Sequence, residues 1–295
     1  MLLPKFTFHE PETLDECLSL LDRYGSDAAV LAGGTDLLVN MKKGLIRPSV
    51  VVSLSRVGEL QGISTDGDSG KLRLGSMVTM DAIATHQVIK KHFSILAQGA
   101  QRLGSPLIRN RATIGGNLVT ARPAADSHGP LICLGAQIEL TGPSGSRKVP
   151  VEDFFQGPGT SVRRSNEVLT QITIDKIPPK CGGVYLKYGI RKTLEISVVN
   201  VSVLLCLEKD KTIAHARVAL GAVSPKTIRS PDTERCLIGN PPDEKTLKKA
   251  AEAAAARCQP ISDIRGSAEY RQILVEVLTR RGIEEAARRA LSRKV

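Results

Sequence analysis

The chain has 295 residues, of which 41% are hydrophobic and 24% charged, and this globular composition excludes a disordered or fibrous protein. Its longest apolar run is too short to cross a bilayer and no signal-peptide pattern follows Met1, so we expect no transmembrane segment and a cytoplasmic location. The net charge of +11 suggests nucleic-acid binding, but aromatic residues make up only 3% and the basic residues form no block. We therefore expect no nucleic-acid partner.

The first part of the chain predicts a strand, a helix and two further strands. Thr13 and Glu16 have the spacing of a capping box, and Gly25 marks the end of the helix that follows them. A strand is predicted over residues 28–31. The segment "PSVVVSLSRV" predicts another strand, with Pro48 at its edge.

The second part alternates short helices with strands. "KLRLGSMVTM" is strand-like, Asp81 is the predicted cap of the helix "AIATHQVIKKH", and "FSILAQGAQRL" predicts a second helix. The glycine pair 115–116 is then expected in irregular chain. "HGPLICLGA" predicts a buried short helix, "QIELTGPSGSRKVPV" a hairpin, and "EVLTQITI" a closing strand.

The third part begins at a predicted linker, "DKIPPKCGG", residues 175–183. Three antiparallel strands are expected after it, with "EKDK" as the turn between the last two, and the remainder is helical by propensity and apolar spacing. The predicted units are residues 1–55, 56–176 and 177–295.

The cysteines and histidines give no metal-site spacing. Six cysteines are scattered without a C-x-x-C pair, and the five histidines are isolated. The cysteines are predicted to be free and mostly buried, as small hydrophobic residues. No metal ligand and no catalytic residue is predicted.

Two segments share an unusual sequence pattern, a glycine pair beside threonine and a polar residue: "LAGGTDLLVN" at residues 31–40 and "RATIGGNLVT" at residues 111–120. A glycine pair lets the backbone take positive φ and approach a ligand closely, and the exposed N–H groups suit an anion. Each pair could instead only turn the chain. Because both pairs are flanked by threonine and a polar residue, a pyrophosphate cradle is favoured, whereas P-loop and Rossmann motifs are absent.

Six ordered blocks resemble one protein family across nearly the whole chain: "AGGTDLLVNMK", "RNRATIGGNLVTARPAAD", "EVLTQITI", "YLKYGIRKTLEIS", "VALGAVSPKTIR" and "DIRGSAEYRQILVEVLTRR". They resemble the FAD-binding medium subunits of the molybdenum hydroxylases, relatives of xanthine dehydrogenase and carbon monoxide dehydrogenase. The resemblance implies an α+β fold. A two-part FAD-binding domain of the vanillyl-alcohol-oxidase (PCMH) type would precede a C-terminal three-stranded antiparallel sheet with helices.

The resemblance also implies a set of FAD-binding residues. The residues expected to enclose the pyrophosphate are Leu31, Ala32, Gly33, Gly34, Thr35, Asp36, Leu37 and Leu38 on one side and Thr113, Ile114, Gly115, Gly116 and Asn117 on the other. Asp126 is expected to bind the adenosine part, or else to cap a helix. Leu169 and Lys187 match flavin-lining positions, although Lys187 could be an exposed strand residue, and Arg191 either lies near the ring or pairs with Glu195. Leu103 stands where xanthine-oxidising relatives have an aromatic ring.

The implied function is an electron relay. FAD would be the cofactor of this chain, while a large subunit carries molybdopterin and a small subunit carries two [2Fe–2S] clusters, in a dimer of heterotrimers. The alternative is a free-standing flavin oxidoreductase of the wider vanillyl-alcohol-oxidase superfamily, although no candidate base is evident for it. The substrate of the complex and the final electron acceptor are left open.

Overall fold

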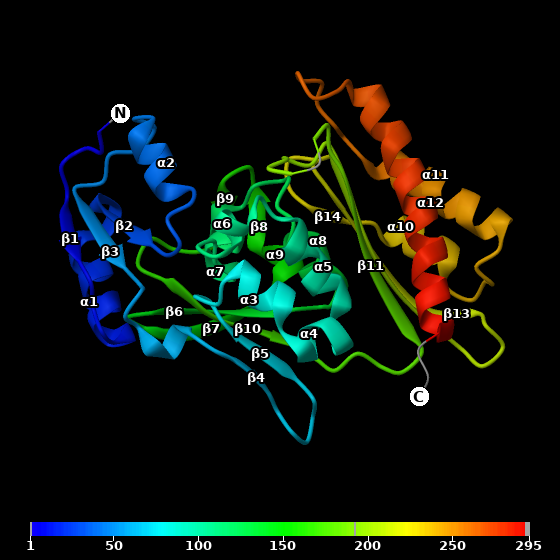
Figure 1. Ribbon diagram of the computed structural model, residues 1–295, viewed down its shortest axis with the longest axis horizontal. Helices are drawn as coiled ribbons and strands as arrows, with labels where there is room; N and C mark the ends of the chain where they lie inside the picture. The colour runs from blue at the N-terminus through cyan, green and yellow to red at the C-terminus, as the bar shows by residue number, and fades with distance from the viewer. Residues whose placement is uncertain (1, 192, 293–295) are drawn as a thin grey trace.

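The computed structural model describes residues 2–191 and 193–292. Three main sheets follow one another along the long axis of the molecule, from the N-terminal end to the long C-terminal helix (Figure 1). A two-stranded sheet pairs β8 (Phe155–Gly157) with β9 (Thr160–Ser161). The chain is therefore a mixed helix and strand protein, as the sequence predicts.

The first sheet is parallel and has the order β1-β3-β2. Its elements are β1 (Thr7–His9), α1 (Leu14–Tyr24), η1 (Gly25–Asp27), β2 (Ala28–Leu31), α2 (Leu37–Lys42) and β3 (Val50–Ser53). The Thr13 hydroxyl accepts from the Glu16 N–H at 3.2 Å, and Gly25 ends α1 with a φ of 51°. The Glu16 carboxylate accepts from the N–H of Glu12 instead of Thr13. The predicted cap is confirmed, with this one change of partner.

The second sheet is antiparallel and has the order β4-β5-β10-β6-β7. Its strands are β4 (Ile63–Thr65), β5 (Leu72–Gly75), β6 (Gln137–Gly142), β7 (Gly145–Pro150) and β10 (Val168–Ile174). The helices of this part are η2 (Gly58–Leu60), α3 (Met80–Thr85), α4 (Gln87–His92), α5 (Ser94–Arg102), α6 (Pro106–Arg109), α7 (Ile114–Thr120), α8 (His128–Cys133) and α9 (Val151–Phe154). The expected "EVLTQITI" strand is its central strand.

Two local predictions in this part are wrong. Thr79, not Asp81, caps the helix that follows, because the Thr79 hydroxyl is the group that reaches the Ala82 N–H, at 3.2 Å. The glycine pair 115–116 lies inside α7, not in irregular chain. Thr113 caps that helix by accepting from the Gly116 N–H, and this bond offsets the low helix propensity of two glycines.

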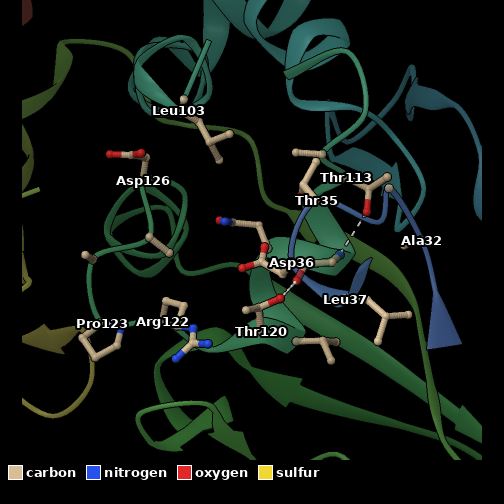
Figure 2. A pocket seen from close by; sticks show the side chains of 18 of the residues that line it. Ala32, Thr35, Asp36, Leu37, Leu103, Thr113, Thr120, Arg122, Pro123 and Asp126 are labelled. Carbon is tan, nitrogen blue, oxygen red and sulfur yellow. Dashed lines mark hydrogen bonds between the residues drawn. The ribbon is translucent and has the colours of Figure 1, made fainter. Parts of the chain in front are cut away.

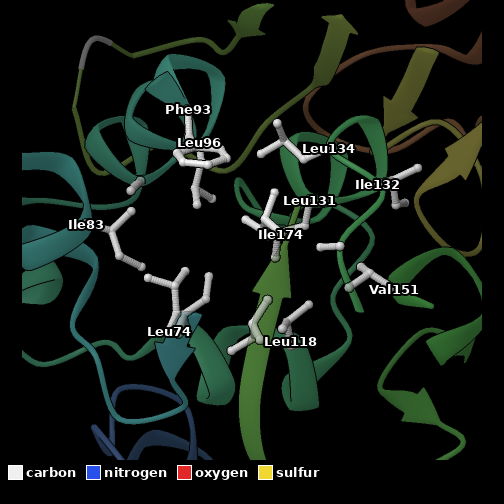
Figure 3. Close-up of a cluster of buried hydrophobic side chains, with 14 of the residues drawn as sticks. Leu74, Ile83, Phe93, Leu96, Leu118, Leu131, Ile132, Leu134, Val151 and Ile174 are labelled. Carbon is white, nitrogen blue, oxygen red and sulfur yellow. The ribbon is translucent and has the colours of Figure 1, made fainter. Parts of the chain in front are cut away.

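A hydrophobic core joins the second sheet to its helices. Leu74 and Ile174 project from β5 and β10 towards Ile83, Phe93 and the other labelled side chains, which come from α3, α5, α7, α8 and α9 and from the residues next to α5 and α8 (Figure 3). Each of the three main sheets has its own buried cluster. The cluster of the second sheet also includes residues of the third sheet, among them Cys181 and Leu204, so the second and third parts of the chain share one hydrophobic core.

The third sheet has four strands, not the three expected, in the order β11-β12-β13-β14. They are β11 (Cys181–Tyr188), β12 (Val199–Leu207), β13 (Ile213–Gly221) and β14 (Ile228–Arg229). The fourth strand has only two residues, too few to produce a periodic sequence pattern. The expected linker is also too long, because residues 181–183 already belong to β11.

Helices cover both faces of this sheet. The helices of the third part are α10 (Pro231–Leu237), α11 (Glu244–Arg257) and α12 (Ala268–Ser292). On one face of the sheet α12 packs on β11 and β12, and on the other face lie α5 and α8 from the second part (Figure 1). All nine residues of β12 are therefore buried, which explains its continuous apolar sequence.

The prediction of free cysteines is wrong for one pair. Cys181 and Cys206 are directly opposite each other in the β11–β12 ladder and form a disulfide. Cys17, Cys133 and Cys258 are free and buried, whereas Cys236 is free and partly exposed. The pair is 25 residues apart in sequence, so only strand pairing brings the two sulfurs together.

Candidate functional site

A cavity of about 1020 Å³ is lined by residues of all three parts of the chain. The upper end of the usual range for ligand sites is about 1,000 Å³. Both glycine segments line this cavity, and Figure 2 shows Ala32 and Thr35 on the same side of it as Thr113, with Asp126 on the other side. The two segments are about 80 residues apart in sequence, so the sheets must be assembled before this wall exists.

The first glycine segment is a loop that leads from β2 into α2. Gly34 has a φ of 76°, a conformation that L side chains rarely adopt. Gly33 is required for a different reason, because a Cβ there would lie 1.8 Å from the backbone oxygen of Arg111. The close contact between Gly33 and Arg111, the first residue of the second segment, therefore holds the two segments together.

The second glycine segment is the first turn of α7. A Cβ on Gly115 would lie 2.6 Å from the Cβ of Ser76, and one on Gly116 would lie 2.9 Å from Thr113 Oγ1. Among these four glycines, only Gly34 has positive φ. The expectation of positive φ at both pairs is therefore wrong for the second, where glycine serves close packing inside a helix.

Buried polar groups support the second segment from behind. The Asn117 side-chain oxygen accepts from the Ser127 hydroxyl at 2.6 Å, and the Asn117 backbone oxygen lies 3.1 Å from His128 Nε2. His128 stacks on Phe155 with a centroid separation of 4.1 Å. Burial lowers the pKa of His128 from 6.5 to about 4, so the ring is neutral at neutral pH.

Most of the predicted site residues line the cavity. They are Ala32, Gly33, Gly34, Thr35, Asp36, Leu37, Leu103, Thr113, Gly115, Gly116, Asn117, Asp126 and Leu169. Leu31 and Leu38 are instead the side chains next to Gly34, and Ile114 belongs to the hydrophobic core. Lys187 is also outside the lining, but it contacts the cavity through Asp126.

Asp126 and Lys187 form a buried ion pair at the cavity wall. The Lys187 ammonium lies 2.9 Å from Asp126 Oδ1, and the two side chains are 7% and 8% exposed. Lys187 also donates to the backbone oxygen of Arg102 at 3.2 Å. The Tyr185 hydroxyl donates to Asp126 Oδ1 at 2.5 Å, and Ser197 lies at 3.4 Å.

The environment of Asp126 sets the ionisation of this cluster. Burial raises the pKa of Asp126, and the Lys187 ammonium and the Tyr185 hydroxyl oppose that rise. Burial and the neighbouring carboxylate raise the pKa of Tyr185 well above 10, so its hydroxyl stays protonated. Because Lys187 is paired, this wall presents a compensated charge and not an isolated cation.

Three questions that the sequence left open are answered by these contacts. Asp126 does not cap α8, since no side chain bonds the N-terminus of that helix. The Lys187 side chain is buried, so Lys187 is not an exposed strand residue. Arg191 pairs with Glu195 at 2.9 Å.

Other lining residues carried no usable sequence signal. Ser76 follows β5 in the chain between the two glycine segments. Thr120 is the last residue of the second segment, and Arg122 comes just after it, where Figure 2 shows it beside Pro123. Arg265 and Arg271 reach the cavity from the third part of the chain. Nothing local marks these side chains as site residues, because only the packing of the three parts brings them to one cavity.

Comparison with known proteins identifies the family of the chain. The family described as "FAD binding domain in molybdopterin dehydrogenase" matches residues 4–177, and the "CO dehydrogenase flavoprotein C-terminal domain" matches residues 184–286. The carbon monoxide dehydrogenase medium chain of Hydrogenophaga pseudoflava is 31% identical, covering 97% of this chain and 98% of that one. The nicotine 6-hydroxylase medium subunit of Paenarthrobacter nicotinovorans is 34% identical, covering 98% and 100%.

A solved structure gives the same result for the fold. Carbon monoxide dehydrogenase from Hydrogenophaga pseudoflava, in a form that lacks the Mo-pyranopterin moiety, contains a chain with a TM-score of 0.94 and 31% identity, covering 98% of this chain and 99% of that chain. The match therefore spans both the glycine segments and the helix-covered third sheet. The chain belongs to the family of FAD-binding medium subunits of the molybdenum hydroxylases.

Proposed function

We propose that FAD binds in the cavity between the two glycine segments and that the chain relays electrons there. The observation that carries this proposal is the convergence of both segments on one cavity of about 1020 Å³, which also contains Asp126. A family match alone would not require these residues to meet. Their meeting supports the pyrophosphate position expected from the sequence.

The residues of the cavity fit this cofactor. Gly33 and Gly115 leave no room for a side chain, which keeps the two segments close enough to contact one ligand. The backbone N–H groups beside the glycines of the first segment and the hydroxyls of Thr35 and Thr113 are suitable donors for phosphate oxygens. The N–H groups of residues 114–117 instead donate within the protein. When bound, FAD supplies redox chemistry that can pass electrons singly or in pairs. The chain itself binds, orients and shields the cofactor.

The paired charge at Asp126 and Lys187 refines the expected tuning of the flavin. A free cation beside the ring would favour its anionic reduced form and raise the potential at which it accepts electrons. Lys187 is already compensated by Asp126, so we propose a smaller effect than a lone lysine would produce. The ion pair holds the Asp126 carboxylate in a fixed orientation at the cavity wall.

The partners are proposed from the family. A large subunit with molybdopterin would oxidise the substrate, and a small subunit with two [2Fe–2S] clusters would deliver electrons to this chain, which passes them to an external acceptor. We further propose a dimer of heterotrimers and the PCMH type of FAD-binding domain. The proposed units 1–55, 56–176 and 177–295 are supported by the sheets, since each unit contains one main sheet.

The location is proposed as the cytoplasm. No helix in residues 2–191 and 193–292 is both long and apolar enough to cross a membrane. The Cys181–Cys206 disulfide counts against the cytoplasm, because disulfides are rare there. Fractionation of cells that produce the chain tests the location, and thiol titration of the native protein tests the disulfide.

The first experiment is a visible absorption spectrum of the purified chain, followed by titration of any colourless fraction with FAD. We expect flavin bands or saturable FAD binding, and the release of FAD on denaturation. A folded chain that binds no FAD, alone or co-expressed with its partner subunits, would contradict the proposal. Co-purification with the two partners tests the assembly separately.

A further inference from the structure

Ser76 occupies a distinctive position behind the second glycine segment. It is the first residue after β5, and its backbone is fully engaged, since its N–H donates to Thr170 and its carbonyl accepts from Gly115. The residue is 3% exposed, and it lines the cavity. Its hydroxyl finds no hydrogen-bond partner among the residues that the structure describes.

An unpaired buried hydroxyl costs free energy, so it calls for an explanation. Ser202 has the same kind of unpartnered, buried hydroxyl, but it lies in β12 and does not line the cavity. Within the described ranges, Ser76 is the one hydroxyl that is both unpartnered in this way and part of the cavity wall. Of these two serines, only Ser76 is placed where a ligand in the cavity can supply the missing hydrogen-bond partner.

The neighbours of Ser76 indicate which part of a ligand it would reach. A Cβ on Gly115 would lie 2.6 Å from the Ser76 Cβ, so the Ser76 side chain packs against the backbone of the segment expected to hold the pyrophosphate. A serine hydroxyl can donate to a phosphate oxygen, and bonds to charged oxygens are the stronger class. We propose that Ser76 Oγ donates a hydrogen bond to an oxygen of the FAD pyrophosphate, an inference that rests on the proposed function.

The test compares Ser76→Ala with the matched control Ser202→Ala in the full chain freed of flavin. We expect Ser76→Ala to raise the dissociation constant of FAD about tenfold, the loss of one hydrogen bond to a charged oxygen. Its stability without FAD should stay the same or rise, because an unsatisfied buried group has been removed. Ser202→Ala should leave the dissociation constant of FAD unchanged.

ADP, which has the pyrophosphate without the flavin, is the second probe. Ser76→Ala should weaken ADP binding by a similar factor, whereas weakened FAD binding with unchanged ADP binding would overturn the pyrophosphate assignment. Equal FAD affinity in Ser76→Ala and wild type would overturn the inference entirely. So would a loss of stability without FAD, which would identify a structural hydroxyl. Failure of the wild-type chain to bind FAD is a separate result and contradicts the proposed function instead.

Discussion

The two glycine segments look alike in sequence and differ in structure. Residues 32–36 form a loop between β2 and α2, with Gly34 at a φ of 76°, whereas residues 113–117 form a capped helical turn. In both, the glycine most tightly enclosed by backbone faces another segment: Gly33 faces Arg111, and Gly115 faces Ser76. The shared glycine pattern therefore reflects the close packing of each segment against another part of the backbone, and not a shared backbone conformation.

The supporting contacts of the two segments also differ. The second segment is backed by His128 and Ser127, and the chain that leaves it carries Asp126. The first segment is followed directly by α2 and has its closest contact in the second segment itself. We expect substitutions in the first segment to weaken its contact with the second segment. Substitutions of Ser127 or His128, which pack behind the second segment, should act through the buried hydrogen bonds that these residues make.

The largest effect is expected for Gly33→Ala. Its Cβ would lie 1.8 Å from a backbone oxygen that no side-chain rotation can move, so we expect a loss of about 4–5 kcal/mol in the free energy of unfolding and loss of FAD binding. Urea unfolding and FAD titration measure the two quantities. Gly58→Ala is the control, because a Cβ there has nothing within 4 Å. Near-wild-type behaviour of Gly33→Ala would mean that the two segments are not held by this contact.

The next effect is expected for Lys187→Met, which leaves the Asp126 carboxylate buried without its cation. Breaking a buried pair in this way should cost about 3–4 kcal/mol of the free energy of unfolding. The double variant Asp126→Asn with Lys187→Met should be more stable than the sum of the single changes predicts. Urea unfolding of the four proteins gives the coupling, and strict additivity would show that the pair contributes nothing as a pair.

A pH effect of similar size is expected from His128. Its pKa falls from 6.5 to about 4 on folding, so between these values the unfolded state takes up a proton that the folded state refuses. Stability should therefore fall as the pH falls from about 6.5 to 4, by about 3 kcal/mol in all. His128→Gln should remove this part of the pH dependence, whereas His92→Gln, at an exposed position, should retain it. Identical pH profiles for wild type and His128→Gln would refute the assignment.

The smallest effect is expected for Gly116→Ala. The new Cβ would lie 2.9 Å from the Thr113 side-chain oxygen and in ordinary contact with the Ala32 Cβ at 3.7 Å, and alanine favours the helix by about 1 kcal/mol over glycine. The two contributions should leave the free energy of unfolding within about 1 kcal/mol of wild type. Thermal unfolding of Gly116→Ala and Gly33→Ala under the same conditions measures the difference in stability between the two variants. A loss as large as that of Gly33→Ala would show that both segments are equally intolerant and would remove the distinction drawn between them.

The sequence by itself determined the elements whose signals are local. The Thr13 cap, the Gly25 helix end and the strand over residues 28–31 were all predicted because apolar spacing and capping act over a few residues. Most of the residues predicted to bind FAD line one cavity, and they were predicted because ordered motifs across the chain resemble one family. The family resemblance placed Asp126 and Lys187 in the site without predicting that they pair.

Only the tertiary structure decided which distant groups meet. The choice of Thr79 over Asp81 depends on the orientation of one hydroxyl, and the two-residue strand β14 exists only because β13 is there to pair with it. The Cys181–Cys206 bond, the Asp126–Lys187 pair and the unpartnered Ser76 hydroxyl at the cavity all depend on contacts across strands or between sheets. Such contacts leave no periodic or spacing signal, because their energy arises only when separate parts of the chain pack together.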